Sequence, residues 1–141
     1  MANDMVRTKE PGADVTGQVT AAVIGCRFLR IAAARTNRFS ALGAAGDGNN
    51  YRVAHCAAGG PCFGVSKYDQ ATVGGKVGVA RGGIVTVLAA SALTAGQKVM
   101  SDATGQAVPW ASAASEANSA LGYAVDDAAG GALAEIALNL M

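Results

Sequence analysis

Short apolar runs separated by glycine-containing turns are the feature that most constrains this chain. Glycines recur every few residues from Gly59 to Gly83, and each would cost the interior of a helix about 1 kcal/mol. Turn signals at intervals of roughly 8–12 residues are typical of all-β sandwiches and small barrels. The high alanine content therefore does not indicate helices. We predict a mainly β fold, either a small antiparallel β-barrel or a sandwich.

The second half of the chain contains three predicted hairpins. Each consists of two apolar runs flanking a turn rich in glycine, aspartate or serine. Within the last run Ile136, Leu138 and Leu140 alternate with polar or small residues, which indicates a half-buried strand. The paired runs are residues 76–80 with 84–88, residues 96–100 with 106–110, and residues 121–125 with 133–140.

The first half of the chain gives weaker signals. Residues 1–18 are polar and show neither helical nor strand periodicity. We therefore expect an extended, mobile N-terminal arm followed by a β-rich domain over residues 19–141. Residues 19–31 read as one strand with a bulge or bend at Gly25. Residues 51–56 and 62–66 read as further strands. The Ala/Ser-rich residues 111–120 are open to either a helix or a loop with a single turn.

The charge balance argues against two classes of partner. Eleven basic residues oppose ten acidic ones, and only 15% of the chain is charged, against about 25% in an average domain. No strong positive field is available for phosphate backbones. The N-terminus lacks the apolar core of a secretion signal, and no apolar run approaches the 18 residues of a membrane span. We expect a protein made in a reducing cytoplasm with no nucleic-acid or membrane partner; its weakly charged surface suits a protein partner.

The cysteines and the single histidine do not form a recognisable catalytic or metal motif. The chain has an odd number of cysteines: Cys26, Cys56 and Cys62. Their spacing is not that of a zinc site, and a fourth ligand is missing. His55 and Cys56 are adjacent on one predicted strand and point to opposite faces, although His55 with Cys62 or Cys26 stays geometrically open. We expect reduced, structural cysteines, no metal, no cofactor and no catalytic residues.

Two further residue groups have alternative interpretations. Asp126 and Asp127 are either a carboxylate pair or a solvated hairpin tip, where aspartate bonds the local backbone. Trp110 follows Pro109 at a strand end, and it either packs in the core or anchors an interface. We take Trp110 as a candidate contact residue.

The order of several phrases resembles the tailed-phage capsid cement or head-decoration family. The resemblance covers roughly residues 60–140, and it ends in a glycine-containing turn followed by a last apolar strand. The phrases are Gly64-Val-Ser66, Gly75-Lys-Val-Gly-Val79, Gly82-Gly-Ile84, Ala92-Leu-Thr-Ala-Gly-Gln-Lys-Val99, Ser101-Asp-Ala-Thr-Gly-Gln-Ala107, Ala120-Leu-Gly-Tyr-Ala124 and Ala134-Glu-Ile-Ala-Leu138.

This resemblance implies a β-tulip-like or barrel domain that forms homotrimers or similar clusters on the outer surface of the phage head. The implied partner is the major capsid protein at local symmetry axes, and no catalytic residue is carried over. The arm then offers Arg7, Lys9 and Glu10 as candidate capsid contacts beside Trp110. The alternative is another non-enzymatic phage β module, such as a tail, fibre or carbohydrate-binding domain.

Overall fold

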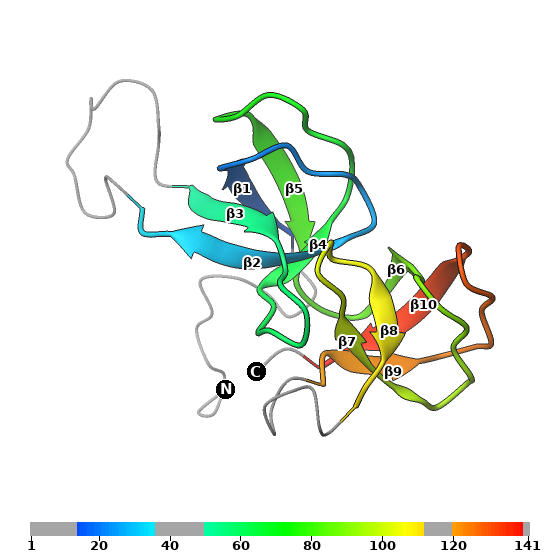
Figure 1. The fold of residues 1–141 in the computed structure, drawn as a ribbon. Coiled ribbons are helices and arrows are strands. Elements are labelled where there is room, and N and C mark those ends of the chain that lie inside the picture. Colours follow the sequence, from blue (N-terminus) through cyan, green and yellow to red (C-terminus); the bar gives the residue numbers. More distant parts are fainter. Residues whose placement is uncertain (1–13, 36–49, 112–119, 140–141) are drawn as a thin grey trace, which may run out of the picture.

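The computed structural model describes residues 14–35, 50–111 and 120–139, and within these ranges the fold is entirely β (Figure 1). The prediction of a mainly β fold is therefore confirmed. The strands are β1 (Val15–Val19), β2 (Phe28–Ala33), β3 (Tyr51–His55), β4 (Gly64–Ser66), β5 (Lys76–Ala80), β6 (Ile84–Leu88), β7 (Lys98–Ser101), β8 (Ala107–Pro109), β9 (Gly122–Ala124) and β10 (Leu133–Leu138).

The first five strands form a closed barrel in the order β1-β3-β2-β4-β5, with β5 pairing back onto β1. All pairs are antiparallel except β1 with β3, which run parallel. The interior is a cluster of aliphatic side chains: Val15, Val19, Val23, Leu29, Val53, Val77 and Val79. Gly17 belongs to this interior because a Cβ there would lie 2.8 Å from the Val53 side chain and 3.0 Å from that of Val79.

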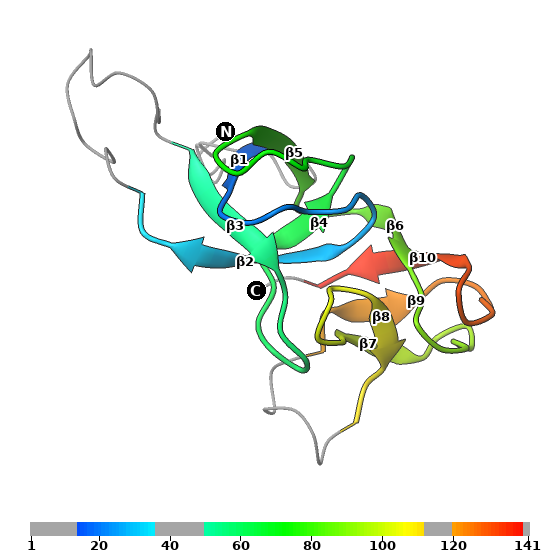
Figure 2. The same cartoon turned by 45° about the horizontal axis from the view of Figure 1, so that its top comes forward.

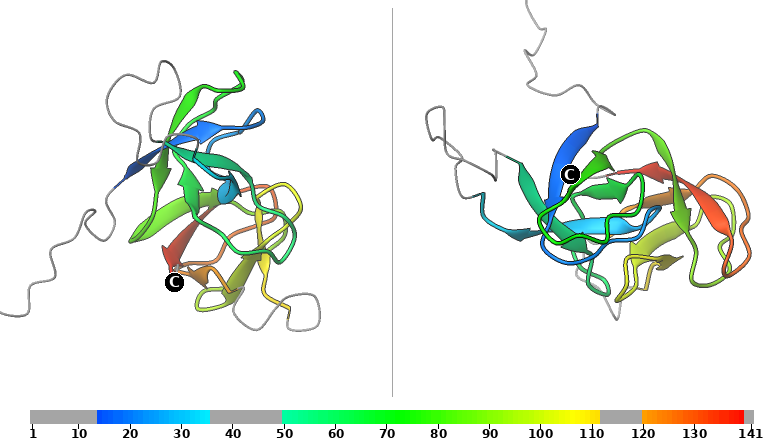
Figure 3. Two further views of the ribbon diagram at one scale, coloured as in Figure 1. Left: turned by 90° about the vertical axis from the view of Figure 1, so that its left-hand side faces the viewer. Right: turned by 90° about the horizontal axis from the view of Figure 1, so that it is seen from above.

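The last five strands form a second sheet in the order β6-β10-β9-β7-β8. Both views in Figure 3 show it lying beside the barrel. Its core includes Val87, Val99 and Ile136, and it also takes in Phe28, Cys56 and Val65 from the barrel strands or the residues flanking them. Because one apolar cluster contains residues of both sheets, the two halves pack as one body.

Hydrogen bonds join the two halves, which lie side by side in Figure 2, at the turn between β7 and β8. The Phe28 amide donates to the Gly105 carbonyl at 2.7 Å, and the Arg27 guanidinium donates to the Thr104 carbonyl at 3.1 Å. Gly105 has φ +81°, and an added Cβ would lie 2.6 Å from the Phe28 carbonyl oxygen. This turn therefore requires glycine both for its backbone conformation and for its contact with the barrel.

The predicted boundary of the N-terminal arm at residue 18 is wrong. Residues 15–18 lie in β1, where Val15 and Gly17 face the barrel interior and Gln18 is buried. The Gln18 side chain donates to the Gly74 carbonyl at 3.1 Å, which removes the cost of burying an amide. The sequence of β1 shows no clear alternation of apolar and polar residues, because glycine stands at an inward position and glutamine is buried. Residues 1–13 lie outside the described residues.

The predicted strand over residues 19–31 is two strands joined by a bend. β1 ends at Val19 and β2 begins at Phe28. The Gly25 amide donates to the Asp69 carboxylate at 2.7 Å, and the positive φ of 56° falls on Cys26 rather than on the glycine. The buried Ser66 hydroxyl holds this bend, because it donates to the Ile24 carbonyl at 2.6 Å and accepts from the Arg27 amide at 3.1 Å.

Two of the three predicted hairpins are confirmed, and the first is wrong. β7 pairs with β8, and β9 pairs with β10. In contrast, β5 pairs with β1 and β4 in the barrel, whereas β6 pairs with β10 in the second sheet. The Gly82-Gly83 turn is the crossover between the two halves, and the Gly83 carbonyl accepts from the Leu138 amide at 2.9 Å. Residues 112–119 lie outside the described residues. They make up most of the segment for which the sequence allows either a helix or a loop.

Candidate interaction surfaces

The histidine and the cysteines occupy structural positions. The Ile24 amide donates to His55 Nε2 at 3.0 Å, and burial, together with the nearby Arg27 charge, lowers the pKa of His55 below its ordinary 6.5. The Cys56 thiol lies beside that of Cys62, and this contact together with burial raises the pKa of Cys56. A thiol whose pKa is raised is a poor nucleophile at neutral pH. His55 thus bonds a backbone amide, and Cys56 stays protonated.

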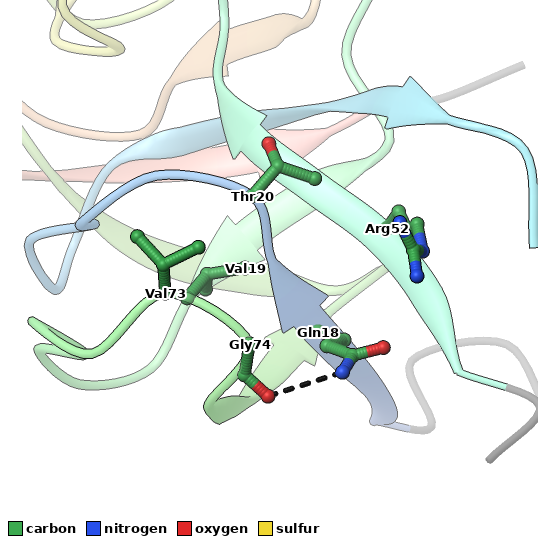
Figure 4. A pocket seen from close by; sticks show the side chains of 6 residues that line it. All are labelled: Gln18, Val19, Thr20, Arg52, Val73 and Gly74. Carbon is green, nitrogen blue, oxygen red and sulfur yellow. Dashed lines mark hydrogen bonds between the residues drawn. The ribbon is translucent and has the colours of Figure 1, made fainter. Parts of the chain in front are cut away.

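Other chemical sites are sparse in the described part of the chain. All three cysteines are free, and no group of three or more His, Cys, Asp or Glu residues in the described ranges is placed to hold a metal ion. No helix in those ranges is long and apolar enough to cross a membrane. A shallow pocket beside β1 contains a single titratable side chain, Arg52, and is bounded by the Gln18–Gly74 hydrogen bond (Figure 4).

The outer face of the second sheet carries several exposed apolar side chains. Strand register aligns Ile84, Ala137, Tyr123, Lys98 and Trp110 in one row across β6, β10, β9, β7 and the end of β8. We call this the outer-face row. Within it Ile84 is 63% exposed and Tyr123 42% exposed. Apolar side chains gathered on one face are typical of a surface that binds another protein.

Trp110 ends the outer-face row and is half-buried. Its amide donates to the Lys98 carbonyl at 2.9 Å, and the Lys98 ammonium lies 5.4 Å from the ring centroid. The indole Nε1 is buried and has no hydrogen-bond partner among the described residues. Trp110 is therefore at the edge of a face rather than in the centre of a core, and its role as a contact residue stays a prediction.

A second surface combines arginines and aromatic rings on the barrel. The rings of Tyr51 and Phe63 are 4.8 Å apart. The Arg35 guanidinium lies 4.5 Å from the Tyr51 centroid, and that of Arg81 lies 4.3 Å from the Phe63 centroid. We call these four residues the arginine–aromatic cluster. Three of them, Arg35, Tyr51 and Phe63, line a groove of about 290 Å³ that also includes the 47%-exposed Ile31. Arginine and aromatic residues dominate the binding energy of many interfaces.

Apart from the residue types, nothing in the sequence predicts this cluster. Tyr51 lies on β3, and Phe63 directly precedes β4. Both strands are neighbours of β2 in the barrel. The pairing of both strands with β2 brings the rings together. The other predicted contact residues, Arg7, Lys9 and Glu10, lie outside the described residues.

Charge is divided between the two halves. In residues 14–35 and 50–81 seven basic side chains accompany two acidic ones, whereas in residues 82–111 and 120–139 one basic side chain accompanies four acidic ones. The near-zero net charge of the chain thus conceals a basic barrel and an acidic second sheet. The barrel residues are Arg27, Arg30, Arg35, Arg52, Lys67, Lys76 and Arg81 with Asp14 and Asp69; the second-sheet residues are Lys98 with Asp102, Asp126, Asp127 and Glu135.

A small β body with an exposed apolar face and an arginine–aromatic cluster fits the class of structural binding proteins. The family model of phage cement proteins matches residues 5–140, so the chain belongs to the phage cement protein family. The match includes all ten strands and begins ten residues before β1. The protein is thus a structural phage protein associated with the virion capsid.

A solved structure shares the fold. The N base of the head fiber gp8.5 of bacteriophage phi29 is similar with a TM-score of 0.64 and 21% sequence identity. The similarity covers 90% of this chain and 93% of that chain, so both halves of the body are included. No curated protein matches the sequence.

Proposed function

We propose that the protein binds the outer surface of the expanded phage head at local symmetry axes and stabilises the shell against the pressure of packaged DNA. The observation that carries this proposal is the cement-family match over residues 5–140, which spans both halves of the body. The partner in this proposal is the major capsid protein, and the protein sits on the shell as a homotrimer.

The proposed mechanism is thermodynamic. A protein that binds only the assembled, expanded lattice stabilises that state by mass action, with about 2.7 kcal/mol per site at a concentration 100 times the Kd. Many sites on one shell add these contributions, and contacts that bridge neighbouring subunits gain from effective concentration. A binding protein needs no catalytic group to act in this way.

The surfaces described above supply candidate contacts. The outer-face row offers apolar area that ends at Trp110, and the arginine–aromatic cluster offers cationic groups already held against rings. Arginines stacked on aromatic rings lose little conformational freedom on binding. Arg7, Lys9 and Glu10 add charged contacts from the N-terminal segment, each contributing little at a solvated rim.

Cosedimentation tests the proposal directly. Purified protein is mixed with undecorated expanded heads, with unexpanded proheads and with isolated tails. We expect saturable binding to expanded heads only, and a higher temperature of DNA release from decorated particles. Binding to tails but not heads would show instead that the protein is another phage β module, and binding to none of the three would contradict a structural role on the particle.

Substitutions separate the two candidate surfaces. Tyr123→Ser on the outer-face row and Arg81→Ser in the cluster both remove exposed side-chain groups. Whichever of the two surfaces faces the capsid, the variant on that surface should reduce occupancy of the capsid sites at least roughly tenfold, as loss of an interface anchor does. Val73→Ser, at a 67%-exposed site apart from both surfaces, is the control. Equal occupancy for all three variants would exclude both surfaces as the main contact.

A further inference from the structure

Glu135 differs from the other acidic side chains in the described part of the second half. Asp102, Asp126 and Asp127 lie between strands, and each of their carboxylates accepts a hydrogen bond from a backbone amide. Glu135 is exposed on β10, and its carboxylate makes no hydrogen bond or ion pair with any described residue. Among these four acids, Glu135 is therefore the one most available to a partner.

The side chains around Glu135 are mostly apolar. On the same face of β10 it lies between Leu133 and Ala137, and strand register places Thr86 of β6 and Val125 of β9 on either side of it. Leu133 and Val125 are exposed, and Ala137 belongs to the outer-face row. A single carboxylate among exposed apolar side chains fits a partner that presents one cation within an apolar surface.

Arg81 has the matching properties on the barrel. It follows β5, its Nε donates to the Phe63 carbonyl at 2.9 Å, and its guanidinium lies 4.3 Å from the Phe63 ring centroid. These two contacts fix the direction of the side chain, whereas its two terminal amino groups have no partner among the described residues. Arginine binds a carboxylate through parallel N–H donors. Arg81 is thus held in place for a carboxylate that its own chain does not provide.

The division of charge favours a second copy of this chain as the partner. The barrel half has an excess of basic side chains and the second sheet an excess of acidic ones. Contact between the barrel of one copy and the second sheet of another pairs opposite charges, whereas contact between two like halves pairs like charges. Both surfaces also bring apolar area, because Phe63 connects Arg81 to Tyr51 and to the groove with the exposed Ile31.

We propose that Arg81 of one copy binds Glu135 of the next, so that the arginine–aromatic cluster of each chain packs on the outer-face row of its neighbour. The contact is head to tail, and such contacts repeat until they close into a ring. The ring is the homotrimer of the proposed function, on which this inference rests for the number of copies. The association takes place in the free protein, before any capsid is bound.

This arrangement assigns to the contact between copies the two surfaces that are also candidate capsid contacts. Arg81→Ser and Tyr123→Ser then lower the occupancy of capsid sites because the protein loses the multivalency of the trimer. The mass of the free protein separates this cause from the loss of a direct capsid contact, since only the former changes it.

Sedimentation velocity of the full chain in free solution tests the contact. The unmodified protein should rise with concentration from the mass of one chain to that of three. Arg81→Glu and Glu135→Arg should each raise the concentration needed for association at least roughly tenfold, because each brings like charges together. The protein with both substitutions should associate again within a few-fold of the unmodified one. Lys76→Glu makes the same charge change at the other end of β5 and should associate normally.

Three results would overturn the proposal: the mass of one chain at every concentration, normal association of both single variants, or no rescue in the double variant while circular dichroism shows all variants folded. Cosedimentation with expanded heads is measured on the same proteins. Head binding by a protein that stays a single chain would exclude this contact and leave the proposed function intact. Association of copies without head binding would support the contact and contradict the proposed function.

Carbodiimide coupling locates the contact. Arg81→Lys keeps the positive charge and supplies an amine, which the reagent joins to a carboxylate in direct contact with it. Peptide mass spectrometry of the coupled trimers should find position 81 linked to Glu135, and adding Glu135→Gln in the same chain should abolish the link. Trimers without this link, or the same link within uncoupled single chains, would show that the two side chains do not meet between copies.

Discussion

The barrel and the second sheet each have five strands, but they differ in how they satisfy their backbones. In the barrel every strand pairs on both sides, because β5 returns to β1. The second sheet is open, and an isolated bridge between Ala89 and Ala107 connects the segment after β6 with β8. The barrel therefore exposes side chains, among them its arginines, rather than an open strand edge. The second sheet offers, in addition, an apolar face and a backbone edge.

The charge difference leads to the same division of roles. A basic barrel and an acidic second sheet orient the molecule in an electrostatic field even though the net charge is +1. Such complementarity affects the rate of association and the choice of partner more than the affinity. The two halves contact each other around Phe28 and Gly105, and substitutions there test how strongly the halves are coupled.

The largest effect is expected for Phe28→Ala. Phe28 is fully buried and packs in the cluster of the second sheet, although it starts a barrel strand. Its loss should lower the free energy of unfolding by about 3–5 kcal/mol and weaken the coupling between the halves. Urea unfolding followed by far-ultraviolet circular dichroism and by fluorescence of Trp110, the sole tryptophan, should then give two separate transitions.

Leu29→Ala is the matched control for this prediction. Leu29 is equally buried but belongs to the barrel cluster. We expect a loss of about 2–5 kcal/mol with the two transitions still coincident. Coincident transitions in both variants would show that Phe28 is not the residue that couples the halves.

A smaller loss is expected for Gly105→Ala. The left-handed conformation costs a residue with a side chain about 1–2 kcal/mol, and the contact with the Phe28 carbonyl adds strain of about 1–3 kcal/mol. Gly96 has φ +80° but open space around it, so Gly96→Ala should show the conformational cost alone. Thermal unfolding of the two variants measures the difference. Equal losses would indicate that the β7–β8 turn shifts away from the barrel without cost.

The next prediction concerns pH. The pKa of His55 is below 6.5 in the folded protein because of burial and Arg27, whereas in the unfolded chain it is near 6.5. The unfolded state therefore binds more protons once the pH falls below 6.5, and the free energy of unfolding decreases from there down to the folded pKa.

Thermal unfolding between pH 8 and pH 5 checks this linkage. His55→Gln keeps an acceptor for the Ile24 amide but does not titrate, so its melting temperature should depend less on pH over this window. Parallel pH profiles for the two proteins would show that the loss of stability comes from other groups.

The smallest effect is a difference in cysteine reactivity. Burial and the neighbouring Cys62 thiol raise the pKa of Cys56, so iodoacetamide at pH 8 should modify Cys56 at least roughly tenfold more slowly than Cys62. Peptide mass spectrometry over time measures both rates. In guanidinium chloride the two rates should become similar, and equal rates in the folded protein would contradict the structural role assigned to Cys56.

Some elements could be predicted because their information is local. The alternation of Ala134, Ile136 and Leu138 with outward-facing residues places β10, and the turns before it and after β7 give the correct hairpins. The family resemblance rests on phrases of the same kind. Each of these inferences depends on a few neighbouring residues.

Other features depend on pairing between distant segments. β5 and β6 flank a Gly-Gly turn that fits a hairpin, yet β5 pairs with β1, some sixty residues earlier, because Val77 and Val79 complete the barrel interior. The sequence pattern assigns residues 15–18 of β1 to the arm, since Gly17 and Gln18 hide an alternation that close contact with Val53 and Val79 explains. The arginine–aromatic cluster and the surroundings of Glu135 have the same origin.

The sequence by itself determined that this chain is built from short strands and tight turns, since glycine spacing and alternation act within a few residues. The tertiary structure alone decided which strand joins which sheet, which half carries each charge, and which edge stays open. The physical reason is that backbone hydrogen bonds between strands are nearly independent of sequence. Their partners are chosen by the apolar interior that closure creates, and no short stretch of the chain contains that information.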